Sequence, residues 1–158
     1  MTNLIENRLK ILGITIPDAT QPIANYVAVS QSNNQLFISG QLPLLNGKPI
    51  TVGKVGVAVN IEQAKKSAEV CAINILAQIK ATLGNLDKIK KIVKTTVFVA
   101  ADSNFTDIPL IANGASDLFV NILGEAGKHA RSAIGVSVLP MNVPVEVEAI
   151  VEISSSYQ

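Results

Sequence analysis

The chain has 158 residues, of which 48% are hydrophobic and only 16% are charged, an apolar composition for a small globular domain. Thirteen Lys and Arg against 12 Asp and Glu, with 4% aromatic residues, give no basic footprint or stacking platform for nucleic acid. One cysteine and one histidine exclude an internal disulfide and any cluster of Cys or His around a metal. We expect one domain over residues 1–158 whose apolar surface is covered by self-association.

The N-terminal segment offers no targeting signal. Residues 1–17 contain Glu6 and have no uninterrupted apolar core, unlike a secretory signal peptide. No apolar run in the sequence reaches the ~18 residues that a membrane-spanning helix needs. The sequence therefore predicts a cytoplasmic protein with no membrane partner.

The first elements in chain order are a short helix and two strands. Residues 3–12 place apolar side chains on one face and are followed by Gly13, which predicts an amphipathic helix that stops there. Residues 26–43 read as two strands joined by a turn at residues 31–34, with Gly40 and Pro43 ending the second. A loop or irregular hairpin is expected around Asn46 and Gly47.

The clearest element is a helix over residues 61–83. Asn60 and Gln63 have the spacing of a capping box, and Gly84 provides the C-terminal stop. Apolar residues recur every three or four positions between them, which defines a buried face. Cys71 lies on that face, so a packed thiol is expected rather than a nucleophile.

The second half of the chain supplies one more helix and three strands. Residues 91–100 form a nearly uninterrupted β-branched run, typical of a strand covered on both sides or nearly so. A helix is expected over 109–123, and strands over 131–139 and 145–153 with a turn at 139–144. This order predicts a mixed sheet with both main helices on one face. The other face would be bare and apolar, which favours oligomerisation.

Two charged residues stand at strand ends, where functional groups tend to lie. Arg131 begins one predicted strand and Glu146 follows the turn into the last one. If these strands pair as a hairpin, about seven residues separate the two positions, or ~23 Å. They could then share a site only across a subunit boundary. Alternatively, Arg131 only pairs with a carboxylate of a neighbouring subunit and fastens the assembly.

Familiar catalytic motifs are missing from the sequence. It has no P-loop, no GxGxxG after a strand, no GxSxG and no HExxH. Serine-histidine chemistry would need His129 beside a serine, and Ser132, three residues along an extended segment, points elsewhere. His129 is expected to be a rim or loop residue.

Three stretches nevertheless resemble one family. They are "YVAVSQSNNQLFISGQLPL", "VKTTVFVA" and "HARSAIGVSVLPMNVPVEVEAI", which together extend from Tyr26 to Ile150. In spacing and order they look like the YjgF-like reactive-intermediate deaminase (Rid) family. The resemblance implies a chorismate-mutase-like α+β fold and a homotrimer with ligand sites in the clefts between subunits. It also implies hydrolysis of imines, derived from enamines such as 2-aminoacrylate, to 2-oxo acids and ammonia.

The resemblance assigns roles to six residues of this sequence. The arginine would hold the substrate carboxylate, because a planar fork of donors suits that group. The glutamate would activate water as a general base, the tyrosine would close over the ligand, and a serine-glycine pair would line the floor. These residues are Arg131, Glu146, Tyr26, Ser39 and Gly40, with Asn113 as a further candidate for ligand binding. No metal or organic cofactor is implied, since an imine is already electrophilic.

The sequence also departs from the family pattern. Ala24-Asn25-Tyr26 replaces the usual Gly-Pro-Tyr, Ala133 stands where a cysteine is usual, and Ser116 stands where a tyrosine is expected. Residues 1–20 form an N-terminal extension, and residues 154–158 are expected to be a frayed tail. A non-catalytic protein that binds or senses small 2-oxo acids in the same cleft is therefore an alternative. An endoribonuclease ranks last, because net charge is near neutral and the usual pair of histidines is unavailable.

Overall fold

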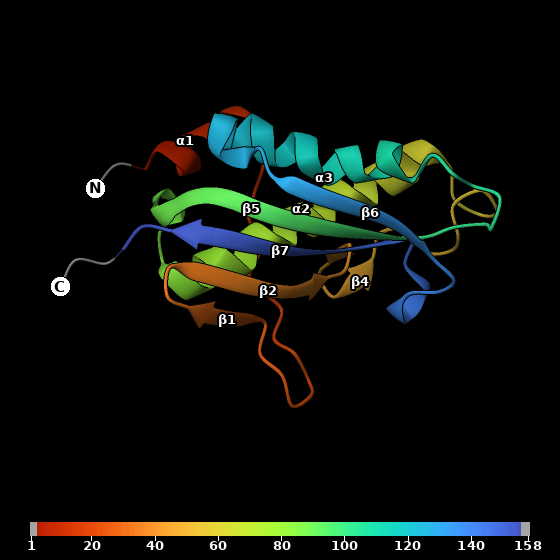
Figure 1. The fold of residues 1–158 in the computed structure, drawn as a ribbon, viewed down its shortest axis with the longest axis horizontal. Coiled ribbons are helices and arrows are strands. Elements are labelled where there is room, and N and C mark those ends of the chain that lie inside the picture. The colour runs from red at the N-terminus through yellow and green to blue at the C-terminus, as the bar shows by residue number, and fades with distance from the viewer. Residues whose placement is uncertain (1–2, 156–158) are drawn as a thin grey trace.

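A five-stranded sheet forms the centre of the computed structural model, which describes residues 3–155 (Figure 1). The strand order is β1-β2-β7-β5-β6. Neighbouring strands are antiparallel except β5 and β6, which are parallel. The strands are β1 (Val29–Ser32), β2 (Gln35–Gln41), β5 (Ile89–Ala100), β6 (Ala130–Val136) and β7 (Val145–Ile153). A separate two-stranded hairpin, β3 (Leu44–Leu45) and β4 (Lys48–Pro49), turns at Asn46 and Gly47 as the sequence predicts.

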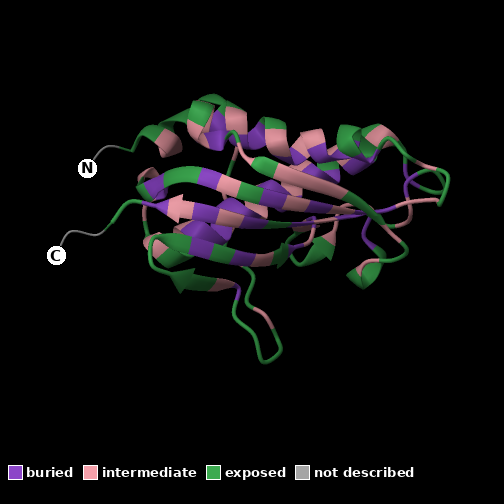
Figure 2. Ribbon diagram, viewed as in Figure 1, coloured by how far each residue is buried: buried purple, intermediate pink, exposed green. Residues whose placement is uncertain are grey.

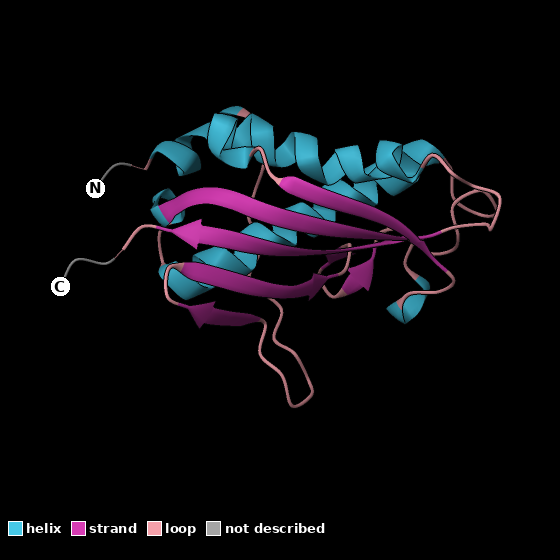
Figure 3. Ribbon diagram, in the orientation of Figure 1, coloured by secondary structure: helices cyan, strands magenta, loops and turns pink. Residues whose placement is uncertain are grey.

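Three helices accompany the sheet. They are α1 (Leu4–Ile11), α2 (Ile61–Leu83) and α3 (Ile108–Leu123). Both long helices lie against the same face of the sheet (Figures 1 and 3), so the predicted α+β chorismate-mutase-like fold is confirmed. None of the helices among residues 3–155 combines the length and apolar composition that crossing a bilayer needs.

The helix α2 begins and ends where local chemistry dictates. The Gln63 N–H donates to Asn60 Oδ1 at 2.8 Å, and the Asn60 N–H donates to Gln63 Oε1 at 3.0 Å. Gly84 adopts a φ of 77° and closes the last turn, a conformation that glycine adopts without steric cost. The buried face is rich in small side chains, so α2 lies close to the sheet and to α3. At Gly114 of α3, a Cβ atom would collide with the backbone carbonyl of Lys65.

Burial alternates along the strands of the sheet, as Figure 2 shows. In β7, alternate residues from Val145 to Ile153 are buried under the helices, and Glu146, Glu148, Ile150 and Glu152 point to the other side. In β5 the same alternation leaves Lys94 exposed and Phe98 half-buried. The strand, expected to be covered on both sides or nearly so, is therefore buried on one face and half-buried or exposed on the other in the single chain. The face away from the helices, which we call the open face, is uncovered.

The last two strands are antiparallel in direction, but they are not neighbours. The strand β5 lies between them, pairing with β6 on one side and β7 on the other. The segment that links β6 to β7 contains a 3₁₀ turn at Pro140–Asn142 and crosses the end of β5. The hairpin assumed for these strands is therefore wrong, because the order of strands depends on contacts distant in sequence.

The N-terminal extension is held against the domain by specific contacts. The Asp87 carboxylate accepts hydrogen bonds from the Leu4 and Ile5 backbone N–H groups, each at 2.9 Å, at the start of α1. Arg8 Nη1 donates to the Ile122 carbonyl at 2.8 Å. At the other end of the chain, Ser154 and Ser155 follow β7 outside any strand, and residues 156–158 of the predicted tail lie outside the described residues.

Candidate functional site

Arg131 is held at the free edge of the sheet, on the face that the helices cover. It is the second residue of β6 and lies opposite Thr95, which is buried. Its Nη1 donates to Asn113 Oδ1 at 2.8 Å and to Ser116 Oγ at 3.2 Å. Because Asn113 and Ser116 are three residues apart on α3, both face the arginine. The guanidinium is thus oriented before any ligand arrives, and its other N–H groups can still serve an anion.

A histidine adjoins the same group. His129 Nδ1 lies 2.6 Å from the Gly127 carbonyl, and His129 Nε2 lies 2.9 Å from Ser116 Oγ. A carbonyl can only accept, so Nδ1 carries the proton, Nε2 is the acceptor, and the Ser116 hydroxyl donates to it. Burial lowers the pKa of His129 below its ordinary value; the hydrogen bond to the Gly127 carbonyl partly offsets this effect, and the charge of Arg131 lowers the pKa further. The imidazole is therefore neutral at neutral pH.

Glu146 lies on the open face, against the backbone of β2. A Cβ atom built on Gly40 would lie 2.8 Å from the carboxyl carbon of Glu146 and closer still to Oε1. The β2–β7 pairing is irregular between Ile38 and Gln41, and this bulge brings Gly40 under the carboxylate. Burial raises the pKa of Glu146 above its ordinary value, and the negative charge of Glu148 raises it further. A partly desolvated carboxylate of this kind is suited to accept a proton from water.

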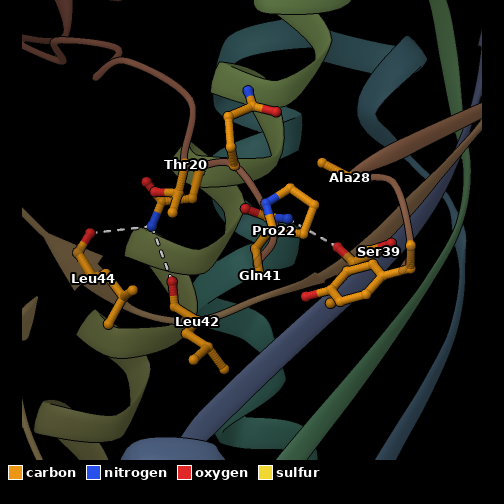
Figure 4. A pocket seen from close by; sticks show the side chains of 11 residues that line it. Thr20, Pro22, Ala28, Ser39, Gln41, Leu42 and Leu44 are labelled. Carbon is orange, nitrogen blue, oxygen red and sulfur yellow. Dashed lines mark hydrogen bonds between the residues drawn. The ribbon is translucent and has the colours of Figure 1, made fainter. Parts of the chain in front are cut away.

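Three further predicted residues line one pocket at the end of β2. Tyr26, Ser39 and Gly40 lie around a cavity of about 120 Å³, together with Ala28, Asn74 and residues 20–22, 41, 42 and 44, and Figure 4 shows these side chains. Side-chain amides of α2 hold the walls in place. Asn74 Nδ2 donates to the Leu42 and Leu44 carbonyls at 2.9 and 3.1 Å, and Gln78 Nε2 donates to the Thr20 carbonyl at 2.6 Å. Tyr26 remains 58% exposed, so its ring is free to contact a ligand at the mouth.

The predicted site residues therefore form two groups in one chain. The arginine half-site contains Arg131 and Asn113 on the helix-covered side. The glutamate half-site consists of Glu146 over Gly40 on the open face, and Gly40 also lines the pocket that contains Ser39 and Tyr26. Along β5, Arg131 is level with Thr95 and Glu146 is level with Phe98.

This register places the two residues closer than a hairpin would allow. Three residues along the strand and two steps between strands give about 14 Å between their Cα atoms. The expected ~23 Å is wrong, because β5 lies between the two strands. The reason that the side chains cannot meet within one chain is instead that they point to opposite faces of the sheet.

Sequence reasoning missed the partner of His129. It considered Ser132, which lies on the opposite face of β6 from Arg131, whereas the structure brings in Ser116 from α3. The spacing of residues in the sequence could have indicated this partner. Asn113 and Ser116 share a helix face, and His129 and Arg131 share a side of an extended segment. Within residues 3–155, no three Asp, Glu, His or Cys side chains come together in a group that could hold a metal ion.

Comparison with known proteins agrees with the fold. The family model described as "YjgF/chorismate_mutase-like, putative endoribonuclease" matches residues 6–153. The chain belongs to this family, the YjgF/Rid family.

Particular relatives match over nearly the whole chain. Protein TCP17 of Trypanosoma cruzi is 41% identical over 148 residues, which cover 93% of this chain and 92% of that protein. A 2-iminobutanoate/2-iminopropanoate deaminase of Dermatophagoides farinae is 29% identical over 141 residues, covering 89% and 94%. The crystal structure of the protein Atu1372 from Agrobacterium tumefaciens superimposes with a TM-score of 0.89 at 48% identity, covering 96% of this chain and 93% of that one.

Proposed function

We propose that this protein hydrolyses small 2-imino acids to 2-oxo acids and ammonia, at sites shared between subunits of a homotrimer. The observation that carries the proposal is the pair of half-sites on opposite faces of one sheet. An oriented guanidinium that has no acidic partner within residues 3–155 lies on one face, and a partly desolvated glutamate lies on the other. A neighbouring copy could bring its glutamate half-site to the arginine half-site. The deaminase among the relatives supports the reaction class.

The chemistry follows from the groups present. Arg131 would bind the carboxylate of the 2-imino acid through the N–H groups not used by Asn113 and Ser116. Glu146 from the neighbouring copy would take a proton from water, and the resulting hydroxide would attack the imine carbon. The imine nitrogen takes that proton from Glu146, which gives a carbinolamine. Glu146 then moves the hydroxyl proton of the carbinolamine to its nitrogen, the C–N bond breaks, and ammonia leaves. The carbon keeps the oxygen as the carbonyl of the 2-oxo acid.

The direct test follows the decay of 2-iminopropionate generated in situ. Wild-type protein should accelerate the decay, and Arg131→Ala should abolish most of that acceleration. Glu152→Gln is a control for the loss of a carboxylate from this sheet. Glu152 lies on the same face of β7 as Glu146 and pairs with Lys90 at 2.9 Å. Equal decay with and without wild-type protein would exclude the deaminase.

A second test asks whether the site is shared between subunits. Arg131→Ala and Glu146→Gln chains are unfolded and refolded together, so that about one site in four receives both intact residues if assembly is random. We expect the inactive variants to regain roughly a quarter of wild-type activity on mixing. A mixture of Arg131→Ala with the double variant should regain none. No recovery in the first mixture would place the whole site in one chain.

A second candidate function is binding without turnover. It is favoured by the arginine half-site, which is complete in one chain and needs no glutamate to hold a carboxylate. Saturable binding of pyruvate that depends on Arg131, without decay of 2-iminopropionate, would support a sensor. A crystal soaked with pyruvate should then show the carboxylate on the guanidinium. A salt bridge from Arg131 to a neighbouring subunit would instead indicate a fastener between subunits.

A further inference from the structure

A serine, a histidine and a backbone carbonyl lie in a row beside Arg131. The Ser116 hydroxyl donates to His129 Nε2 at 2.9 Å, and His129 Nδ1–H donates to the Gly127 carbonyl at 2.6 Å. A nucleophile within hydrogen-bond reach of a base, with that base oriented by a third group, is the arrangement that activates serine for covalent catalysis. Imine hydrolysis has no use for such a nucleophile.

The imidazole is built to accept a proton. The ring of Phe119 meets that of His129 edge to face, with centroids 5.9 Å apart, and fixes its plane. Because the Gly127 carbonyl holds the proton on Nδ1, the lone pair of Nε2 points at Ser116 Oγ. The charged group beside it is Arg131, which disfavours the protonated form. Ser116 and His129 are both partly exposed, so a small molecule can reach them from the edge of β6.

Arg131 supplies the third requirement, a positive charge close to the reacting atom. Its Nη1 donates to Ser116 Oγ at 3.2 Å, which stabilises negative charge on that oxygen. The same guanidinium is positioned to stabilise the oxyanion that forms when the serine attacks an acyl carbon. Its remaining N–H groups favour an acyl compound that also carries a carboxylate.

From this geometry we propose that Ser116 is a nucleophile with His129 as its base, and that it accepts an acyl group from small anionic esters. In the first step, Oγ bonds to the acyl carbon while its proton passes to His129 Nε2. The tetrahedral oxyanion collapses, the ester C–O bond breaks, and the alcohol leaves with the proton from His129. Water then attacks the acyl-serine and gives a proton to His129, the bond between Oγ and the acyl carbon breaks, Ser116 Oγ takes that proton back, and the carboxylic acid is released. The overall reaction is ester hydrolysis, and it is independent of imine chemistry.

The experiment uses two acetyl esters that leave the same adduct. The full chain is incubated with 3-carboxyphenyl acetate or with its uncharged counterpart phenyl acetate, and acetylation is located by peptide mass spectrometry. We expect the acetyl group on Ser116, formed about tenfold faster from the charged ester, because a charge-assisted hydrogen bond adds binding. That preference should vanish in Arg131→Ala. His129→Asn should slow acetylation at least about 100-fold.

Control variants separate chemistry from folding. Ser116→Ala should lose the adduct, and Ser132→Ala, on the opposite face of β6, should keep it. Ser116→Cys provides a second readout, because Cys71 is fully buried and the introduced thiol would be the only accessible one. It should react with iodoacetamide at a pH well below that of an ordinary thiol and lose this reactivity in combination with His129→Asn. Acetyl groups found on lysines but not on Ser116, or labelling of Ser116 unchanged by His129→Asn, would overturn the proposal. In either case the Ser116–His129 bond would only connect α3 to β6.

Discussion

Replacing Gly40 by alanine should remove catalysis while leaving the protein folded. All three of the nearest atoms that the new Cβ would meet belong to the Glu146 side chain, and its carboxyl carbon would be 2.8 Å away. Carbon atoms in ordinary contact are about 3.5–4.0 Å apart. The Glu146 carboxylate must therefore move by about 1 Å. Gly40 does not have a positive φ, so alanine causes no backbone strain at this position.

The size of the effect can be worked out from this displacement. A shift of about 1 Å in a catalytic group costs on the order of 100-fold in rate. The stability of the variant should stay within about 1 kcal/mol of the wild type, because a flexible side chain can turn away and alanine also restricts the unfolded chain. Binding of pyruvate should change much less than the rate, because the substitution leaves the Asn113 and Ser116 hydrogen bonds that orient Arg131 in place.

The assay compares three measurements on Gly40→Ala and the wild type. They are the decay of 2-iminopropionate, the calorimetric affinity for pyruvate, and the urea midpoint of unfolding. Gly135→Ala in β6 is the matched control, because its Cβ would meet Ile108 at an ordinary 3.6 Å. Deamination by Gly40→Ala within threefold of the wild-type rate would show that the position of Glu146 over β2 does not matter for the reaction. That result would refute the reasoning.

Three other predictions concern binding, pH and stability. Arg131→Lys should weaken pyruvate binding about tenfold or more by calorimetry, because an ammonium group cannot keep both the Asn113 bond and a two-point grip on a carboxylate; binding equal to wild type would contradict this. Deamination should fall as the pH drops through the raised pKa of Glu146, since only the ionised carboxylate accepts a proton. Glu148→Gln should move that fall to lower pH by removing a negative charge, whereas a pH–rate profile that Glu148→Gln leaves unchanged would argue against Glu146 as the base. Asp87→Ala should cost about 1–2 kcal/mol in urea unfolding, because two N–H groups of α1 lose their acceptor, and the exposed Asp117→Ala should cost far less.

Local chemistry was predictable from the sequence, and the assembly of distant strands was not. The ends of α2 follow from Asn60, Gln63 and Gly84, whose hydrogen bonds join residues three or four apart. The alternation in β7 follows from its own side chains. The distance and relative orientation of Arg131 and Glu146 depend instead on β5 entering between β6 and β7, and no residue of β6 or β7 encodes that insertion locally.

The candidate site likewise has features that the sequence predicts and features that depend on contacts between distant segments. The residues with family spacing were named from the sequence, and the structure adds what each one contacts. Gly40 under Glu146 results from a bulge in β2, which sequence patterns do not reveal. The Ser116–His129 pair needed α3 to pack beside β6, although both residues carry the right periodicity.

Because the sheet lies between Glu146 and Arg131 of one chain, turnover and the recognition of small acids can change independently in evolution. A substitution that displaces the glutamate on the open face leaves the guanidinium, with its asparagine and serine partners, unchanged behind the strands. A lineage could therefore lose turnover in one mutational step and keep recognition of small acids intact. Conversely, substitutions around Arg131 would alter ligand preference without changing what the Glu146 side chain of the same chain contacts. A fold arranged in this way can give rise to both enzymes and ligand-responsive regulators from one scaffold.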